Sequence, residues 1–331
     1  SVLPVVDTAT IRVNIGHSLS SLYLAPSSGS LLSYYQGEIS ISDTMTTPLF
    51  MSSKKQKLKI SSDKKNVIGP VTANVITVRW RDGALPLISV TQGATTVKYK
   101  YGQMQIKVVR GALEVTNSLS LHDEYLLGIS EVSSSWPSAV LEAQTIASRS
   151  YGLSKISKVT TSCDCHVYAH TADQNFVGYA KEAEARVGSL WKAAVLRTTV
   201  DSSTGLAILS NGKPIQAYFF SSSGGATQSS LDAWGGVTSY TQSVPDSASV
   251  DSTLNPRFAS WNSSAEQNIV AQAFGLTDVI KLEIVARNTA GAVTWIKGIS
   301  QSGASKTLRG DTFRSRAKLP SPWFDLVGVQ Y

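Results

Sequence analysis

The sequence is poor in charged residues, because Asp, Glu, Lys and Arg make up 16% of its 331 residues, against about 25% in a typical soluble protein. It has only two cysteines, and no run of about 18 apolar residues that could cross a membrane as a helix. A hydrophobic content of 42% excludes a disordered polyelectrolyte, and the absence of heptads excludes a coiled coil. We therefore expect a folded chain without a transmembrane segment.

The first ten residues contain neither a basic region nor an apolar stretch, so no signal peptide is visible. The chain begins with Ser1 rather than Met, and it is rich in Ser, Thr and Asn. These features are typical of a trimmed, exported protein. We expect an extracytoplasmic location, in the cell wall or secreted, with a signal or anchor removed upstream of Ser1.

Basic residues outnumber acidic ones by 30 to 23, which gives a formal net charge of +7. The densest lysines lie at residues 54–59 and at Lys64 and Lys65. No aromatic residues alternate with them, as they would in a groove for single-stranded nucleic acid, so we expect no nucleic-acid partner. Two interpretations remain, a solvated strand face or attraction to an anionic polymer such as a bacterial cell wall.

Alternating apolar residues predict a β-rich region over residues 1–94, in which Ile76, Val78 and Trp80 share one face of a strand. A helix is predicted over about residues 137–151, with Pro137 in its first turn and Gly152 at its end. A weaker helical pattern covers part of residues 180–196. The fold class is therefore α+β, β-rich with a few helices.

Three hairpins are predicted from turn residues between apolar runs. One joins residues 97–101 to 105–109 through Gly102, and one joins 207–210 to 214–220 through Asn211 and Gly212. The third joins 280–285 to 293–296. The second of these leads directly into a glycine-rich loop at residues 221–225.

Glu131 is the first candidate for catalysis, because it stands in a short apolar stretch just before the predicted helix. Apolar neighbours would raise the pKa of this carboxyl group toward that of a proton donor, whereas a helix N-terminus favours the ionised form. The alternative is a structural glutamate that caps the helix or forms a salt bridge.

The loop Ser223-Gly224-Gly225, followed by Thr227, could bind a ligand through its backbone N–H groups, since glycine allows close approach. The alternative is a flexible polar loop. The sequence contains neither the G-x-S-x-G motif of a nucleophile elbow nor a phosphate-binding loop.

Cys163, Cys165, His166 and His170 form the one cluster with the chemistry of metal ligands. The spacing favours a disulfide or free thiols, because paired cysteines of a zinc site usually have two or more residues between them. A zinc site, or a catalytic thiol paired with a histidine, is the alternative.

Several blocks in order resemble the SpoIID/LytB family of sporulation and cell-wall proteins. They comprise residues 117–128, Glu131 with Ser135-Trp136-Pro137, residues 141–151, residues 165–168, Asp173-Gln174, residues 205–216, residues 218–227 and segments between 308 and 324. Val132-Ser133 stands where the sporulation proteins carry Met-Pro, but Trp136 keeps its distance from the glutamate. The resemblance covers about residues 95–331 and implies a SpoIID-like catalytic domain there, after the β-rich region 1–94.

Lytic members of this family are peptidoglycan lytic transglycosylases, so the resemblance implies that Glu131 acts as acid and then as base. It also implies that a group of residues binds the glycan, namely Gln144, Arg149, Tyr151, Ser221, Ser222, Ser223, Gly224, Gly225 and Thr227. The implied partner is the peptidoglycan glycan strand. Some relatives bind zinc near the block matched by Cys165, but with another ligand spacing, so we expect no cofactor.

Two other functions are open at this point. The chain could be a non-catalytic module that binds the cell wall and stimulates an N-acetylmuramoyl-L-alanine amidase, as proposed for proteins of the LytB type. It could also be a metal-dependent hydrolase that uses the Cys/His cluster.

Overall fold

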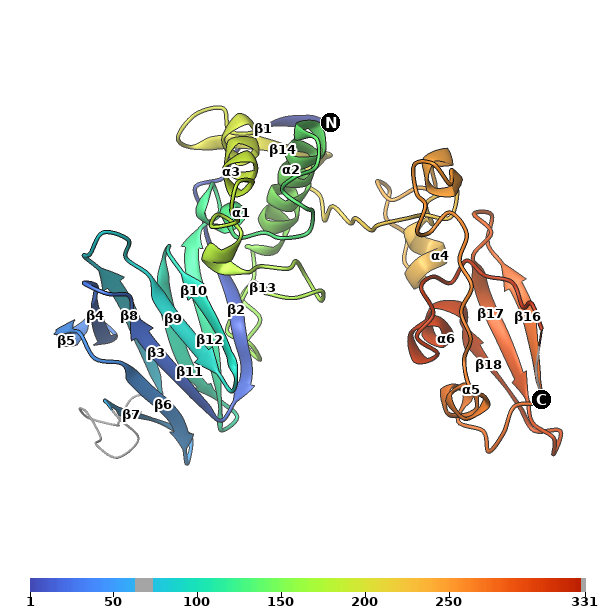
Figure 1. The fold of residues 1–331 in the computed structure, drawn as a ribbon, viewed down its shortest axis with the longest axis horizontal. Helices are drawn as coiled ribbons and strands as arrows, with labels where there is room; N and C mark the ends of the chain where they lie inside the picture. The colour runs from blue at the N-terminus through green and yellow to red at the C-terminus, as the bar shows by residue number, and fades with distance from the viewer. Residues whose placement is uncertain (63–73, 329–331) are drawn as a thin grey trace. The chain divides into compact units, whose positions relative to one another are not determined.

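The computed structural model describes residues 1–62 and 74–328, which form two compact units, Ser1–Tyr218 and Phe219–Tyr331 (Figure 1). The described chain is β-rich with a small number of helices, which confirms the α+β class. Lys64 and Lys65 lie outside the described residues. The division expected between residues 94 and 95 concerns the extent of the SpoIID-like part and stays a prediction.

Two antiparallel-rich sheets form the larger part of the first unit. The seven-stranded sheet has the order β13-β2-β12-β11-β8-β4-β5, with β13 at Val167–Tyr168, β2 at Thr10–Leu19, β12 at Ala112–Ser120, β11 at Gln103–Val109, β8 at Val75–Arg81, β4 at Leu31–Gln36 and β5 at Ile39–Met45. The five-stranded sheet has the order β10-β9-β3-β6-β7, with β10 at Thr95–Tyr99, β9 at Ile88–Gln92, β3 at Ser21–Pro26, β6 at Leu49–Lys54 and β7 at Lys57–Ser61. Inward-facing residues of both sheets share one core.

The strands obey the period of two that the sequence predicts. Ile76, Val78 and Trp80 of β8 are all buried, and β11 buries every second residue. Burial of such side chains stabilises a fold by about 1.5–3 kcal/mol each. Lys54, Lys55 and Lys57 lie at the exposed turn between β6 and β7, Lys59 is partly buried within β7, and Leu58 faces the core.

Helices gather at one end of the sheets in the first unit (Figure 1). They are α1 at Glu124–Leu127, α2 at Ser138–Lys155 and α3 at Gly188–Arg197, with a short 3₁₀ turn, η1, at Gly178–Ala180. A three-stranded sheet beside them consists of β1 at Val2–Val6, β14 at Thr204–Ser210 and β15 at Lys213–Pro214. The expected helix is confirmed, but Pro137 occupies the N-cap and the helix does not end at Gly152.

The second unit has a sheet of three strands, β16 at Lys281–Arg287, β17 at Val293–Ile299 and β18 at Ser305–Arg309. Two helices, α5 at Gln267–Phe274 and α6 at Gly310–Arg316, pack on this sheet through Phe274 and Phe313 (Figure 1). A short helix, α4 at Ser230–Trp234, and a 3₁₀ turn, η2 at Ser247–Val250, lie in the irregular segment before α5.

Two of the three expected hairpins are present. β14 and β15 meet at Asn211 and Gly212, both with positive φ, and β16 pairs with β17. The hairpin expected between residues 97–101 and 105–109 is wrong, because β10 and β11 belong to different sheets. Gly102, with φ of +74°, turns the chain there, and a Cβ on it would come 2.1 Å from Ser118 O.

Candidate active site

Glu131 lies on the connection between α1 and α2, beside a chain segment that follows β13. Ser130 N donates to Asn175 O at 2.8 Å, and Asn175 Nδ2 donates to Ser130 O at 2.9 Å. Ile129 forms an antiparallel bridge with Phe176. The connection is therefore fixed at Ile129 and Ser130 by main-chain pairing and by one side-chain hydrogen bond, although it contains no regular element.

The carboxylate of Glu131 is half-buried and accepts one hydrogen bond from the described residues. The donor is Asn175 N, 2.6 Å from Glu131 Oε1. Neither structural alternative describes this glutamate: α2 has Pro137 at its N-cap without a side-chain hydrogen bond, and no ion pair of the described residues includes Glu131. Its second oxygen is left without a hydrogen-bond partner from that part of the chain.

A buried lysine holds the residue after Glu131. Lys181 Nζ donates to Val132 O at 2.8 Å and lies 3.2 Å from Glu184 Oε1. Its ammonium group also stands 5.4 Å from the ring centroid of Trp191, and its side chain is 1% exposed. A lysine this deeply buried needs such partners, because an unpaired charge in the interior is costly. Lys181 therefore holds the Glu131 connection from the inner side.

Tyr151 of α2 and Asp173 form a second group. The Tyr151 hydroxyl donates to Asp173 Oδ1, and Asp173 Oδ2 accepts a hydrogen bond from Tyr168 N at 2.8 Å. Lys155 Nζ lies 3.7 Å from Asp173 Oδ1. Burial and then the hydrogen bond to Asp173 raise the pKa of Tyr151, so this hydroxyl is a donor at neutral pH.

Charges of both groups act on the pKa of Tyr125, which is fully buried in α1. Burial raises its pKa well above the ordinary value, and the charges of Asp173 and Glu131 raise it further. Its hydroxyl accepts a hydrogen bond from Gln174 Nε2 at 3.1 Å. Glu131, Asp173 and Gln174 thus lie around one buried tyrosine.

Gln144 and Arg149 of α2 are placed differently from Tyr151. Gln144 is 8% exposed, and its Nε2 donates to Ser148 Oγ at 3.1 Å. Arg149 is completely buried, with Nε 2.8 Å from Asp7 Oδ2 in an ion pair that lacks the alignment of a hydrogen bond. Its Nη1 donates to Leu206 O and to Thr198. Because Arg149 presents no exposed atom, its observed contacts support the fold rather than a direct contact with a ligand.

The Ser221–Thr227 loop belongs to the second unit and is ordered by its own contacts. Ser223 Oγ donates to Asp246 Oδ2 at 2.7 Å, and Gly225 N donates to Ser223 Oγ at 3.2 Å. Gly224 has φ of +75° and lies against Trp323, where a Cβ would come within 2.9 Å of the ring. Hydrogen bonds from Ser249 and then Ser223 hold the pKa of Asp246 below its usual value.

Ser222 and Thr227, also expected in this loop, have partners as well, and Ser221 is exposed. Ser222 Oγ accepts a hydrogen bond from Asn255 Nδ2 at 3.0 Å, and Thr227 Oγ1 accepts one from Val244 N at 2.9 Å. The Ser-Gly-Gly turn is therefore a hydrogen-bonded structure on the second unit.

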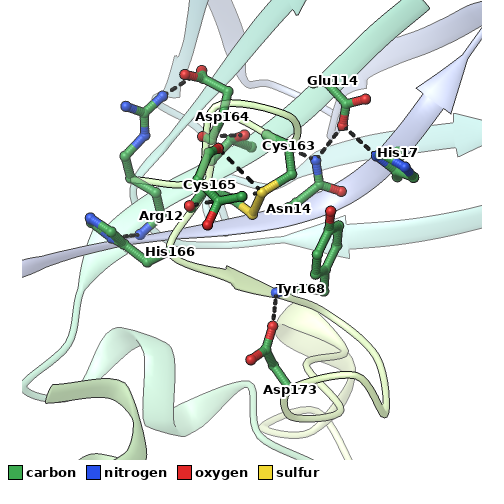
Figure 2. The surroundings of a disulfide bond; sticks show 12 residues. Arg12, Asn14, His17, Glu114, Cys163, Asp164, Cys165, His166, Tyr168 and Asp173 are labelled. Carbon is green, nitrogen blue, oxygen red and sulfur yellow. Dashed lines mark hydrogen bonds and ion pairs between the residues drawn. A yellow bond between two sulfur atoms is a disulfide. The ribbon is translucent and has the colours of Figure 1, made fainter. Parts of the chain in front are cut away.

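Cys163 and Cys165 form a disulfide, which is buried under β2 and β12 (Figure 2). Asp164, between them, makes ion pairs with Arg12 and Lys107. His166 Nδ1 accepts a hydrogen bond from Arg12 N at 3.0 Å, and burial lowers the pKa of this imidazole. Over residues 1–62 and 74–328, no three His, Cys, Asp or Glu side chains converge as they would around a metal ion.

Sequence reasoning alone missed Asn175 and Lys181. Asn175 follows directly on the Asp173-Gln174 block, which offers a positional clue, but nothing in its local sequence indicates a contact with Glu131. Lys181 and Glu184 have the spacing of a helical ion pair, which looks like an ordinary surface pair in the sequence.

Residues 109–204 match the SpoIID family model, described as stage II sporulation protein. The matched segment contains Glu131 together with Asn175, Lys181 and the Tyr151–Asp173 pair. This match ties the chain to the remodelling of the cell wall. Over residues 109–204 the match confirms the resemblance to the SpoIID family. No curated protein matches the chain.

None of the helices within the described residues is both long enough and apolar enough to span a membrane.

Proposed function

We propose that the protein is a peptidoglycan lytic transglycosylase that cleaves the bond between MurNAc and GlcNAc and leaves 1,6-anhydroMurNAc ends. The observation that supports this most is the arrangement of Glu131. One of its oxygens accepts the Asn175 N–H, and the other has no hydrogen-bond partner among the described residues. A half-buried carboxyl group with one free oxygen suits proton transfer to a ligand.

The fixed oxygen determines where the proton resides. A main-chain N–H can only donate, so Oε1 must remain an acceptor whether Glu131 is protonated or ionised. The transferable proton is therefore carried by Oε2. This geometry allows the same oxygen to act first as the acid and then as the base.

The reaction then balances without water. Glu131 Oε2 gives its proton to the glycosidic oxygen as the bond to MurNAc C1 breaks, and the GlcNAc end leaves as an alcohol. The resulting carboxylate takes the proton of the C6 hydroxyl while that oxygen bonds to C1. Glu131 ends protonated, and the sugar ends as a 1,6-anhydro ring.

A single catalytic carboxyl group is sufficient for this reaction, whereas ordinary glycosidases need two, about 5–9 Å apart. Asp173 is the other carboxylate considered for a catalytic role, but both of its oxygens accept hydrogen bonds, one from the Tyr151 hydroxyl and one from Tyr168 N. The contacts of Asp173 favour a positioning role for it. This supports the one-carboxylate reaction over two-carboxylate hydrolysis.

Within the first unit we propose that Tyr151 and Gln144 of α2 bind the glycan. Separately, we propose that the Ser221–Thr227 loop of the second unit binds it. We propose that Arg149 instead holds α2 in place through its buried ion pair with Asp7. The partner would be the glycan strand of peptidoglycan, which places the protein outside the cytoplasm. No cofactor enters the proposed reaction.

The test is digestion of purified peptidoglycan followed by mass spectrometry of the released muropeptides. Wild-type protein should release anhydro-ended fragments, and Glu131→Gln should abolish them, since an amide cannot donate the proton. Glu142→Gln is a matched control, because Glu142 lies on α2 in an exposed ion pair with Arg197. Loss of activity in both variants would contradict the assigned role of Glu131.

If wild-type protein releases no fragments but raises the rate of an added N-acetylmuramoyl-L-alanine amidase, the chain is instead a wall-binding module that stimulates that enzyme.

A further inference from the structure

Three aromatic rings stand in a row on the surface of the first unit, beside the loop that carries Asp173. The centroid of the Tyr168 ring lies 5.6 Å from that of His17, which it meets edge-on, and 5.1 Å from that of His170. Both histidines are exposed and Tyr168 is partly exposed. Figure 2 shows the Tyr168 ring lying beside His17, with its backbone tied to Asp173.

A buried carboxylate, that of Glu114, holds the His17 ring in place. Glu114 is 2% exposed, and its carboxylate lies 2.9 Å from His17 Nδ1 while it accepts hydrogen bonds from Asn14 Nδ2 and Ser18 N. A buried carboxylate with three partners holds the His17 ring in one orientation. The other ring nitrogen, Nε2, lies 3.3 Å from Ser18 Oγ.

The other two rings are fixed through their main chain. Tyr168 pairs with Asn14 in the parallel contact between β13 and β2. His170 Nδ1 accepts a hydrogen bond from Ala172 N at 3.2 Å, and His170 O accepts one from Asp173 N at 2.9 Å. These contacts hold the main chain of the loop and the imidazole of His170.

The same loop reaches the candidate active site. Asp173 accepts the Tyr151 hydroxyl, and Asn175 N holds Glu131. The segment from Tyr168 to Asn175 has only eight residues. One end of it carries the ring of Tyr168, and the other end donates the hydrogen bond to the carboxylate of Glu131.

We propose that Tyr168, flanked by His17 and His170, is a stacking platform for one N-acetylhexosamine ring of the glycan strand. The weakly positive C–H face of a pyranose complements the negative face of an aromatic ring. The exposed imidazole groups can bond its hydroxyl or acetamido groups, and His17 Nε2 would do so in exchange for its contact with Ser18 Oγ. The sugar as ligand rests on the proposed function. The platform itself rests on the observed row of rings.

The test measures binding without turnover, using full-length protein that carries Glu131→Gln. The probe is a hexamer of β-1,4-linked N-acetylglucosamine, titrated by calorimetry. Tyr168→Ala and His170→Ala should each weaken binding by about two- to tenfold, if a sugar contact resembles a contact between two aromatic rings. Tyr168→Phe should bind as the parent does, because it keeps the ring.

Tyr23→Ala is the matched control, since Tyr23 is an exposed tyrosine on β3 in the other sheet of the same unit, and it should leave binding unchanged. Unchanged binding in the double variant Tyr168→Ala/His170→Ala would overturn the platform, and so would absence of binding by the parent. Either result leaves the catalytic role of Glu131 to be decided by the muropeptides that the wild-type protein releases, so the two proposals can fail separately.

Discussion

The main-chain N–H of Asn175 lies 2.6 Å from Glu131 Oε1, although 44 residues separate the two in sequence. The side chain of the same asparagine bonds Ser130 O. One residue thus fixes both the carboxylate and the backbone that carries it. The activity of Glu131 should therefore depend on Asn175.

Asn175→Ala keeps the N–H bond to Glu131 but removes the side-chain bond to Ser130 O. We expect a loss of about 0.5–1.5 kcal/mol in the free energy of unfolding, the usual size for one hydrogen bond. The kcat on solubilised peptidoglycan should fall while KM changes little, since the orientation of the acid is affected more than ligand contact. A change in KM alone would show that Asn175 contacts the substrate instead.

Lys181→Met should disturb the same connection from its inner side. It leaves the carbonyl of Val132 without its donor, at a cost of about 1–3 kcal/mol in stability by urea unfolding. The kcat should fall as well. Glu184→Gln is the control, because it removes the ion pair and keeps the bond to Val132 O. Equal losses of kcat in the two variants would refute a positioning role for Lys181.

Asp7→Asn should destabilise the first unit strongly. Asp7 and Arg149 are both completely buried, and burial lowers the pKa of Arg149 while Asp7 raises it. Breaking a buried ion pair on one side costs about 3–5 kcal/mol. The exposed pair Arg197–Glu142 provides the comparison, and Glu142→Gln should cost at most about 1 kcal/mol. A small effect of Asp7→Asn would mean that water reaches Arg149.

The Ser-Gly-Gly loop should loosen in acid. Hydrogen bonds from Ser249 and Ser223 depress the pKa of Asp246 in the folded state. The stabilisation they supply is present above the pKa of the unfolded chain, and it is lost as the pH falls through the lower folded value. NMR titration of the Asp246 carboxyl group should show that lower pKa, and Asp246→Asn should reproduce the loosening at neutral pH. A pKa at or above the ordinary value would contradict this.

Much of the fold could be predicted because its signals are local. The alternation of β8 and the Asn211-Gly212 turn appear in the sequence as they appear in the structure. The helix was found, but Gly152 did not end it, because that glycine is buried and its missing side chain makes room for Leu121 and Ile11. Packing against residues distant in the sequence determines where the helix ends, and the residues next to Gly152 do not reveal that packing.

The error at residues 97–109 has a similar origin. Gly102 does turn the chain, as expected, but β10 pairs with β9, and β11 pairs with β12 and β8. A hairpin pattern predicts where the chain turns, but it does not determine which strands pair with each other.

The candidate site divides in the same way. Glu131 and Tyr151 could be selected from the sequence because they stand in family motifs. The contacts of Asn175 and Lys181 could not be predicted from the sequence. Each joins residues more than 40 positions apart and depends on how the chain after β13 packs beside the connection between α1 and α2.

The most direct test of the central claim is digestion of purified peptidoglycan in water enriched in heavy oxygen, with mass spectrometry of the new sugar ends. If Glu131 takes the proton of the C6 hydroxyl, the ends are 1,6-anhydro rings without the heavy label, and Glu131→Gln yields none. Reducing ends that carry heavy oxygen would show that water attacks C1, and would contradict the account.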